Sequence, residues 1–535
     1  MQRRIPIAVA GMVATAMVAI WSARTSAERS LLTNSQLSAS TANALAPDGF
    51  ELAGDAAYGE LDRLQLEHAG RGVRLISGRD ENGDARRAGS VSTRVTQVTP
   101  ERGRWFRFRI RALCQDGFKV EKDALYLNVE FFKDRGTNPL DHVRKAIYPL
   151  VERDRTNLRD SGTNRSLGLA AWRSYDLEFR TPFPEVDTLV LTAGFEHGVG
   201  RGDNAEFWIS EFELVPIAER VLTAPREKAD PATSSPAELV PLGGRWYYDP
   251  RGDSPTPPAR FDHTNADRLC YRSDRIETPF VDNMSSWLRA GYLDRSRQVV
   301  SEDRFVPDNL VITITKTHLL AHSQDLPNHP TAVFPDRWRV LDGNPNYISQ
   351  QNFTWLIPLE PQVNPRHVAM ESGNQNGALP MGPIGMAVNG VPFFNPFDAG
   401  AEDAVWRLDR CCGHPSPDAA YHYHKYPVCT KSPWSDDGEE HSPVIGFAFD
   451  GFPIYGPYEA KGVLAKDSQS NPLNEFNIHH DDVRGWHYHV TPGKFPHIIG
   501  GYWGVAETRN QGRPPRPVGG AGGFGLPFGP QRPTR

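Results

Sequence analysis

The histidines of this chain are spaced as they are in strands that bind transition metals. Residues 421–424 read YHYH, and residues 486–489 read WHYH. Side chains alternate between the two faces of a strand, so both histidines of each word share one face and the aromatic residues occupy the other. Two such imidazoles, joined by a third from a nearby loop, commonly bind zinc, copper or iron. The pattern predicts a metal site without distinguishing among these three metals.

Each pair has a further histidine eight residues before its first member. The predicted ligands are His414, His422 and His424 in the first copy and His479, His487 and His489 in the second, with His441 able to complete either set or to bridge both. Asp409 and Asp450 are predicted to orient the imidazoles through hydrogen bonds. The alternative is that these histidines are buried hydrogen-bonding groups without a metal.

A catalytic metal centre would also need an open coordination position and a general base. Glu440 and Asp481 are carboxylates close to the histidines, and nothing in the sequence singles out either of them. Whether the protein is an enzyme, and of what reaction, therefore stays open. The chain has no Gly-x-Ser-x-Gly word, which argues against a covalent serine hydrolase.

The histidine words belong to a longer repeat. Residues 386–396 read MAVNGVPFFNP, and residues 447–457 read FAFDGFPIYGP. Asn389 matches Asp450 at an offset of 61, and the three histidines of each copy match at an offset of 65. Such self-similarity predicts one supersecondary unit that is built twice and packed about a pseudo-two-fold axis.

Taken in order, these motifs resemble the YHYH-domain family over about residues 308–504. The resemblance also includes the LPNH of residues 326–329, the GHP of residues 413–415 and the FPHIIGGYWG of residues 495–504. The second copy departs from the pattern, because Trp486 replaces a tyrosine and Phe476 and Ile478 stand where a cysteine and a glycine are expected. The resemblance implies a domain boundary and secretion, and it implies no reaction.

The elements that precede these motifs are predicted to be mainly β. Apolar and polar residues alternate over 106–111, 126–131 and 175–180, and apolar runs follow at 189–191 and 207–214. Half-buried strands at this spacing favour a β-sandwich or jelly roll over residues 46–217, with one helix near 140–152. This domain resembles galactose-binding-like jelly rolls, which implies carbohydrate binding through Trp172 or Trp208. The alternative is that both tryptophans belong to the core of a spacer domain.

The rest of the chain divides by composition. Residues 1–27 are predicted to be a signal peptide or an N-terminal anchor, because Arg3 and Arg4 precede an apolar run. Residues 28–45 and 218–240 are expected to be linkers. Residues 241–305 are a turn-rich segment without an assigned role, with a short helix expected at 283–292. The YHYH domain is expected over 306–505, and residues 506–535 form a Gly-, Pro- and Arg-rich tail predicted to be disordered.

Charge and cysteines limit the function further. The net charge of -6 gives no basic excess for nucleic acid. Export would permit disulfides, and Cys429 is predicted to pair with Cys411 or Cys412. The alternative is that one of these thiols binds metal. The sequence therefore predicts a secreted or periplasmic metal-binding protein that contacts a membrane only through an uncleaved N-terminal segment. The alternative is a non-catalytic cell-surface module that binds polysaccharide.

Overall fold

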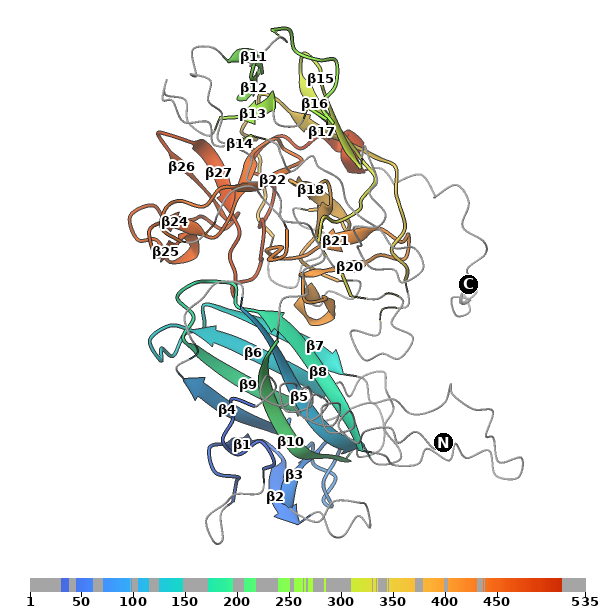
Figure 1. The fold of residues 1–535 in the computed structure, drawn as a ribbon, viewed down its shortest axis with the longest axis vertical. Coiled ribbons are helices and arrows are strands. Elements are labelled where there is room, and N and C mark those ends of the chain that lie inside the picture. Colours follow the sequence, from blue (N-terminus) through green and yellow to red (C-terminus); the bar gives the residue numbers. More distant parts are fainter. Residues whose placement is uncertain are drawn as a thin grey trace, which may run out of the picture.

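The protein is described here as a computed structural model made almost entirely of strands (Figure 1). The described residues contain no α-helix, only short 3-10 turns. The mainly-β prediction is confirmed. The structure describes residues 30–37, 45–60, 71–96, 98, 104–114, 125–147, 172–195, 206–217, 239–250, 255–262, 264–265, 268–272, 283–284, 309–329, 331–332, 334, 344, 346–370, 379–398, 403–430, 436 and 438–511.

The N-terminal domain is a sandwich of two five-stranded sheets, in the orders β1-β4-β9-β6-β7 and β2-β3-β10-β5-β8. Alternate residues such as Phe106 and Phe108 in one sheet and Leu127 and Val129 in the other fill the core between them. The strands are β1 (Glu51–Ala53), β2 (Ala56–Glu60), β3 (Arg71–Ile76), β4 (Ser90–Thr96), β5 (Trp105–Cys114), β6 (Leu125–Phe132), β7 (Asp141–Ile147), β8 (Trp172–Arg180), β9 (Thr188–Phe195) and β10 (Glu206–Ile217).

Two details of this domain differ from the sequence prediction. The helix expected near 140–152 is wrong over its described part, because β7 pairs antiparallel with β6 there. The domain also begins before residue 46, since Leu37 is fully buried in its core and the Leu31 N–H donates to the Leu214 carbonyl. The predicted signal segment, residues 1–27, and most of the linker, residues 218–238, lie outside the described residues.

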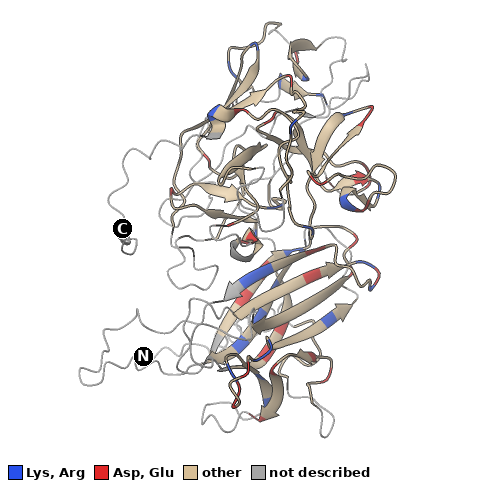
Figure 2. Ribbon diagram, turned by 180° about the vertical axis from the view of Figure 1, so that it is seen from behind, with Lys and Arg blue, Asp and Glu red and all other residues tan. Residues whose placement is uncertain are grey.

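Arginine and carboxylate pairs lie across strands β5 and β8 of the sandwich. In Figure 2, basic and acidic residues are interspersed along its strands. Arg107 contacts Glu178 at 2.9 Å and Arg109 contacts Asp176 at 2.7 Å, each across the β5–β8 pair. These partly exposed pairs stabilise the sheet modestly and leave no single-sign surface on it.

Two small sheets cover the core of the C-terminal domain. The first is β11 (Val240–Gly243), β12 (Trp246–Tyr248), β13 (Leu269–Tyr271) and β14 (Asn283–Met284), and the second is β15 (Leu310–Ile314), β16 (His318–Ser323) and β17 (Phe353–Pro358). Trp246 packs against Phe447, with 5.3 Å between ring centroids, so the described part of the turn-rich segment belongs to this domain. The helix expected at 283–292 begins instead as strand β14, and its remaining residues lie outside the described part.

An eight-stranded sheet organises this domain, in the order β20-β21-β19-β18-β22-β23-β27-β26. The order is palindromic: four strands carry the first copy of the repeat, and four carry the second in mirrored positions. The two halves meet where β18 pairs antiparallel with β22. The strands are β18 (Pro383–Ala387), β19 (Pro392–Phe394), β20 (Gly413–Pro415), β21 (Tyr421–Tyr423), β22 (Val444–Ala448), β23 (Pro453–Tyr455), β26 (Ile478–Asp481) and β27 (Gly485–His489).

Shorter elements complete the domain. They are the hairpin β24 (Tyr458–Ala460) and β25 (Val463–Leu464), and the 3-10 turns η6 (Ala404–Arg407), η7 (Ala465–Asp467) and η8 (Thr508–Gln511). The tail predicted from residue 506 is ordered as far as η8, where Asn510 hydrogen-bonds to the backbone of Leu356. Residues 512–535 lie outside the described part.

The two domains pack against each other through buried polar contacts. Lys425, which follows β21, donates to both carboxylate oxygens of Asp141 in β7 at 3.0 Å, and both side chains are almost fully buried. Arg410 contacts Glu178 at 2.9 Å, and Tyr458 enters the core of the sandwich. Within the described part of the chain, no helix has the length and apolar character needed to cross a membrane.

Candidate metal centres

The histidines of each copy lie on one face of a hairpin. His414 of β20 pairs with His422 of β21, and His479 of β26 pairs with His487 of β27. His424 directly follows β21, and His489 ends β27. The tyrosines of both words point the other way and are fully buried in the core. Strand alternation therefore separates imidazoles from aromatic rings, as the sequence predicted.

Centre one is the cluster of His414, His422 and His424. The Nε2 atoms of His414 and His424 are 3.2 Å apart, and ligand nitrogens of all three rings lie within 4.8 Å of one another. The rings are buried, and Phe394 stacks on His422 with 3.8 Å between centroids. The structure thus brings together the three histidines predicted for the first copy.

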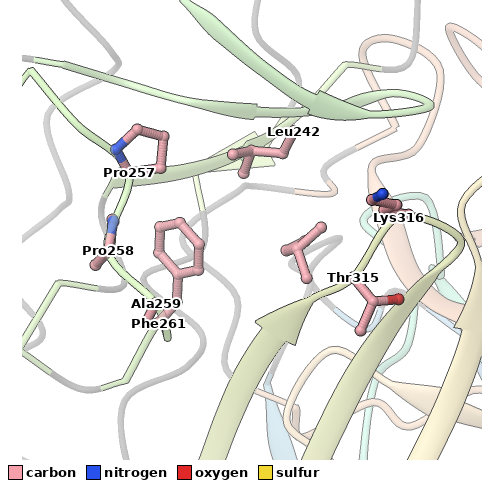
Figure 3. A pocket seen from close by; sticks show the side chains of 8 residues that line it. Leu242, Pro257, Pro258, Ala259, Phe261, Thr315 and Lys316 are labelled. Atoms are coloured by element: carbon pink, nitrogen blue, oxygen red, sulfur yellow. The ribbon is translucent and has the colours of Figure 1, made fainter.

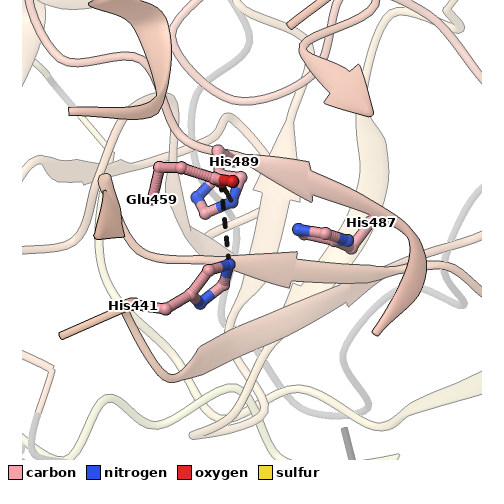
Figure 4. Close-up of side chains that lie close together, drawn as sticks. All are labelled: His441, Glu459, His487 and His489. Carbon is pink, nitrogen blue, oxygen red and sulfur yellow. Dashed lines mark ion pairs between the residues drawn. The ribbon is translucent and has the colours of Figure 1, made fainter. Parts of the chain in front are cut away.

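Centre two contains His479, His487 and His489 together with two further donors, His441 and Glu459. The Nε2 of His479 lies 3.0 Å from that of His487 and 3.1 Å from Glu459 Oε2. Glu459 Oε2 also lies 3.5 Å from His489 Nε2 and 3.9 Å from His441 Nε2. Figure 4 shows His441 and His489 pointing at Glu459. His441 therefore lies in the second cluster and does not bridge the two.

Sequence reasoning missed Glu459. The signal was present in the repeat, because PFFNPFD at residues 392–398 aligns with PIYGPYE at 453–459, which places Asp398 opposite Glu459. Of the two carboxylates considered from sequence, Asp481 lies 3.9 Å from His487 Nε2, whereas Glu440 is exposed.

Backbone carbonyls fix the orientation of the imidazoles in the same way in both copies. The Nδ1–H of His424 donates to the Asn395 carbonyl, and that of His489 to the Gly456 carbonyl, which is the matching residue of the repeat. His422 and His487 each donate to the carbonyl two residues earlier. His479 donates to the Asn471 carbonyl at 2.8 Å. Each of these five rings therefore presents Nε2 to its cluster, and a carbonyl partner of this kind is typical of metal-binding histidines.

Burial disfavours the charged form of five of these imidazoles. It lowers the pKa of His422, His441 and His487 well below the ordinary value, and neighbouring imidazoles lower each of them further. Burial also lowers the pKa of His424 and His489. For Glu459, burial raises the carboxyl pKa, but the neighbouring imidazoles of His479 and His489 outweigh burial and hold the pKa far below its usual range.

This geometry brings ring nitrogens of centre two close together. His479 and His487 each use Nδ1 to donate to a backbone carbonyl, and their Nε2 atoms lie 3.0 Å apart. His441 Nε2, His489 Nε2 and Glu459 Oε2 are buried without a hydrogen-bond partner. Nitrogens that share a tetrahedral zinc at 2.0–2.1 Å stand about 3.3 Å apart. The residues of centre two therefore fit a transition metal.

The predicted role of Asp409 and Asp450 is wrong. Asp450 accepts hydrogen bonds from the Tyr488 hydroxyl at 2.6 Å and from the Gly504 N–H at 2.9 Å. Asp409 accepts from the Tyr421 hydroxyl and from backbone N–H groups. Both carboxyls lie on the tyrosine side of the strands, because strand alternation sends tyrosine and histidine to opposite faces. These carboxyls accept hydrogen bonds from the tyrosines, whereas backbone carbonyls accept hydrogen bonds from the imidazoles.

Among the described residues, the cysteines and the other histidines lie outside the two centres. Cys411 is bonded to Cys429, which selects one of the two predicted pairings, and Cys412 is a buried free thiol. His329 lies near this disulfide, but its Nε2 hydrogen-bonds to the Tyr423 hydroxyl. Because both sulfurs are committed to the disulfide, this third grouping is not a metal candidate.

The two tryptophans predicted to bind carbohydrate lie in one row across the sandwich. Trp208 of β10 and Trp172 of β8 both pair with Leu113 of β5, on the face opposite the core-facing Ala112. Both are half-buried, and the Arg74 guanidinium lies 5.7 Å from the Trp208 ring. The row brings the two predicted residues together without testing their role.

A separate shallow pocket of about 550 Å³ lies between the small sheets of the C-terminal domain (Figure 3). Its lining includes Pro257, Pro258 and Phe261 from one side and Thr315 and Lys316 from the other. None of its lining residues belongs to either histidine centre, so it adds nothing to their chemistry.

Comparisons with known proteins identify one part of the chain. Residues 354–474 match the model of the YHYH protein family, so this part is a YHYH domain, as the motifs indicated. The match contains all of centre one, and it ends before the three histidines of the second copy. No curated protein matches the chain.

Three solved structures show partial similarity to this chain. One is the enzymatically active domain of tailspike protein 4 of bacteriophage CBA120, with 13% identity and a TM-score of 0.22 over 35% of this chain and 21% of that chain. Another is a family 16 carbohydrate-binding module, with 11% identity and a TM-score of 0.18 over 30% and 86%. The third is the K1 cleaved adhesin domain of Lys-gingipain from Porphyromonas gingivalis W83, with 14% identity and a TM-score of 0.21 over 32% and 93%. At these scores the similarities define no ligand or activity for this chain.

Proposed function

We propose that this protein is an exported metal-binding protein whose C-terminal domain holds two transition-metal ions. Centre one binds its ion through three imidazoles. Centre two binds its ion through donors drawn from four imidazoles and the carboxylate of Glu459. The metal is zinc, copper or iron, since all three accept such donor sets. A bound ion would supply Lewis acidity or redox chemistry, and the imidazoles and their carbonyl partners hold it in a water-poor site.

One observation carries this proposal: the Nε2 atoms of His479 and His487 face each other at 3.0 Å while both Nδ1 atoms donate to carbonyls. A proton on His479 would satisfy one contact, to His487 or to Glu459. It would leave His441 and His489 still buried without a hydrogen-bond partner at Nε2. A single cation would satisfy His441, Glu459, His487 and His489 at once, because their ligand atoms all lie within 4.8 Å of one another.

The two ions are expected to be independent. β21 and β27 are separated by four strands in the sheet, which corresponds to about 24 Å at ordinary strand spacing. Figure 1 places β20–β21 and β26–β27 on opposite sides of the domain. Each centre is therefore mononuclear.

Elemental analysis of the purified full chain tests the proposal. After loading with Zn²⁺ and gel filtration, we expect two equivalents of metal in the unmodified protein. His422→Ala/His424→Ala and His487→Ala/His489→Ala should each retain one, and His318→Ala/His322→Ala, on another sheet, should retain two. Absence of metal after separate loading with zinc, copper and iron would overturn the proposal, provided that circular dichroism shows the protein folded.

Export is supported by the disulfide between Cys411 and Cys429, because such bonds persist in oxidising compartments. We propose a secreted or periplasmic location, reached through the segment at residues 1–27. Cell fractionation tests this, and full-length protein in the cytosol would contradict it.

A second candidate function, polysaccharide binding, is favoured by the row of Trp208, Leu113 and Trp172 on one face of the sandwich. Aromatic side chains aligned across strands present flat apolar surfaces to a ligand. Retention on insoluble polysaccharides should fall at least tenfold in Trp172→Ala/Trp208→Ala and persist in His422→Ala/His424→Ala. Equal retention of both variants would exclude the tryptophan row.

A further inference from the structure

We propose that centre one keeps an open coordination position for water or a small anion, whereas Glu459 and His441 close the corresponding positions of centre two. This inference rests on the proposed metal centres and assigns them different roles. Centre one is the site at which an exogenous ligand reaches the metal, and centre two is coordinatively filled.

The difference follows from two positions of the repeat. Glu459 of centre two places Oε2 3.1 Å from His479 Nε2 and 3.5 Å from His489 Nε2. Its counterpart is Asp398, which is one methylene shorter. Asp398 is close enough for its charge to act on His424. Within the described residues, however, no carboxylate oxygen lies within 4.8 Å of ligand atoms of all three imidazoles of centre one.

The second difference is His441. It joins Glu459, His487 and His489 in a group of four whose ligand atoms all lie within 4.8 Å of one another, a group that does not include His479. The residue at the matching offset in the first copy is Pro380, which offers no side-chain donor. Centre one therefore has three protein donors, whereas centre two has four whose ligand atoms lie within 4.8 Å of one another.

The number of protein donors distinguishes catalytic metal sites from structural ones. Three protein ligands with a position left for water or substrate are typical of catalytic metal sites, and complete protein sets are typical of structural ones. At centre one, Phe394 covers His422 and is itself half-buried, so one wall of the centre reaches towards the surface. The ligand class is a small oxygen or nitrogen donor, such as water, hydroxide or a compact anion.

Azide titration of the copper(II)-loaded full chain tests this, with the azide-to-copper charge-transfer band as the readout. His487→Ala/His489→Ala leaves centre one, and His422→Ala/His424→Ala leaves centre two. We expect the first variant to bind one azide per copper and the second to show no band. Azide binding at both centres, or at neither although copper is retained, would overturn the inference.

Reciprocal exchange of the carboxylates provides the matched control. Asp398→Glu, in the protein that retains only centre one, should weaken azide binding at least tenfold. Glu459→Asp, in the protein that retains only centre two, should allow azide to bind. If neither exchange changes azide affinity, the carboxylate does not set the open position. Loss of copper from the unmodified protein would instead refute the proposed function, and elemental analysis of the same samples separates that outcome from a failure of the inference.

Discussion

In the repeated tetrapeptide, the tyrosine and the histidines lie on opposite faces of one strand and have different roles. Tyr488 donates to Asp450 on the core side, and its neighbours His487 and His489 direct Nε2 into centre two. In the first copy, Asn389 takes the place of Asp450 and its amide donates to the Tyr423 hydroxyl at 3.0 Å. The polar residue at this position therefore anchors the tyrosine, and through it the orientation of the histidine strand.

At the residue scale, Asp450 gives a prediction about pH. Burial raises the pKa of Asp450 from 3.8 to about 6, although hydrogen bonds partly oppose the shift. The folded protein thus binds a proton that the unfolded chain releases between these pH values. This contribution to stability is fully present below pH 3.8 and is lost as pH rises through 6. It amounts to about 3 kcal/mol.

Asp450→Asn removes the titration. The free energy of unfolding of the unmodified protein, minus that of Asp450→Asn, should fall by about 2–3 kcal/mol from pH 4 to pH 7 in denaturant titrations. Asp467→Asn, which changes an exposed carboxylate of the same domain, serves as the control and should show no such trend. A difference for Asp450→Asn that stays constant with pH would contradict the prediction.

At the scale of elements, glycines let the two halves of the eight-stranded sheet approach closely. A Cβ on Gly446 in β22 would lie 2.4 Å from the Met386 carbonyl oxygen and 2.5 Å from the Phe393 ring. A Cβ on Gly385 in β18 would lie 2.6 Å from the Phe447 carbonyl oxygen. The seam between the two copies therefore accepts no side chain at these positions.

Gly446→Ala should destabilise the C-terminal domain by about 1–3 kcal/mol, because overpacking forces the two strands apart. Gly59→Ala in β2 is the control, since a Cβ there meets nothing within 4 Å. Thermal unfolding followed by circular dichroism compares them. Equal melting temperatures for the two variants would show that the seam tolerates the methyl group.

Periodicity predicted the strands and the three imidazoles of each copy, because alternation is a local property. Periodicity did not predict secondary structure or side-chain partners where these depend on tertiary contacts. β7 contains Asp141 and Lys145, whose burial depends on distant partners, and its sequence was interpreted as a helix. Glu459 lies on another hairpin, so only the alignment of the copies could have found it. The roles of Asp409 and Asp450 were assigned by proximity in sequence, which does not say which face of a strand a partner reaches.

At the scale of the whole molecule, the N-terminal sandwich contacts the residue that follows one ligand of centre one. Lys425 directly follows His424 and is buried against Asp141 of the sandwich. The matching residue of the second copy is Val490, which is also buried but apolar. Within the described part of the chain, an ion pair to the N-terminal domain therefore lies next to a ligand of the first centre and not next to one of the second.

Asp141→Asn should destabilise the protein by about 3–5 kcal/mol, because it leaves the Lys425 ammonium buried without a counter-charge. It should also reduce metal at centre one and leave centre two occupied, as measured by elemental analysis in the single-centre variants. Glu439→Gln, which breaks the exposed pair with Lys461, is the control and should cost about 0–1 kcal/mol. Equal metal loss at both centres would show that Asp141 acts on the whole fold rather than on centre one.

Because the two copies occupy mirrored halves of the eight-stranded sheet, a protein with only one copy is expected to behave differently. β18 and β22 join through three residue pairs, and every residue of β22 is buried. Either half alone would expose the backbone N–H and C=O groups of this edge strand without partners. Two identical halves could satisfy each other across it in an isologous C2 dimer, with the same symmetry that relates the copies now. A protein containing only the first half should therefore self-associate, and its two histidine clusters should then be chemically equal.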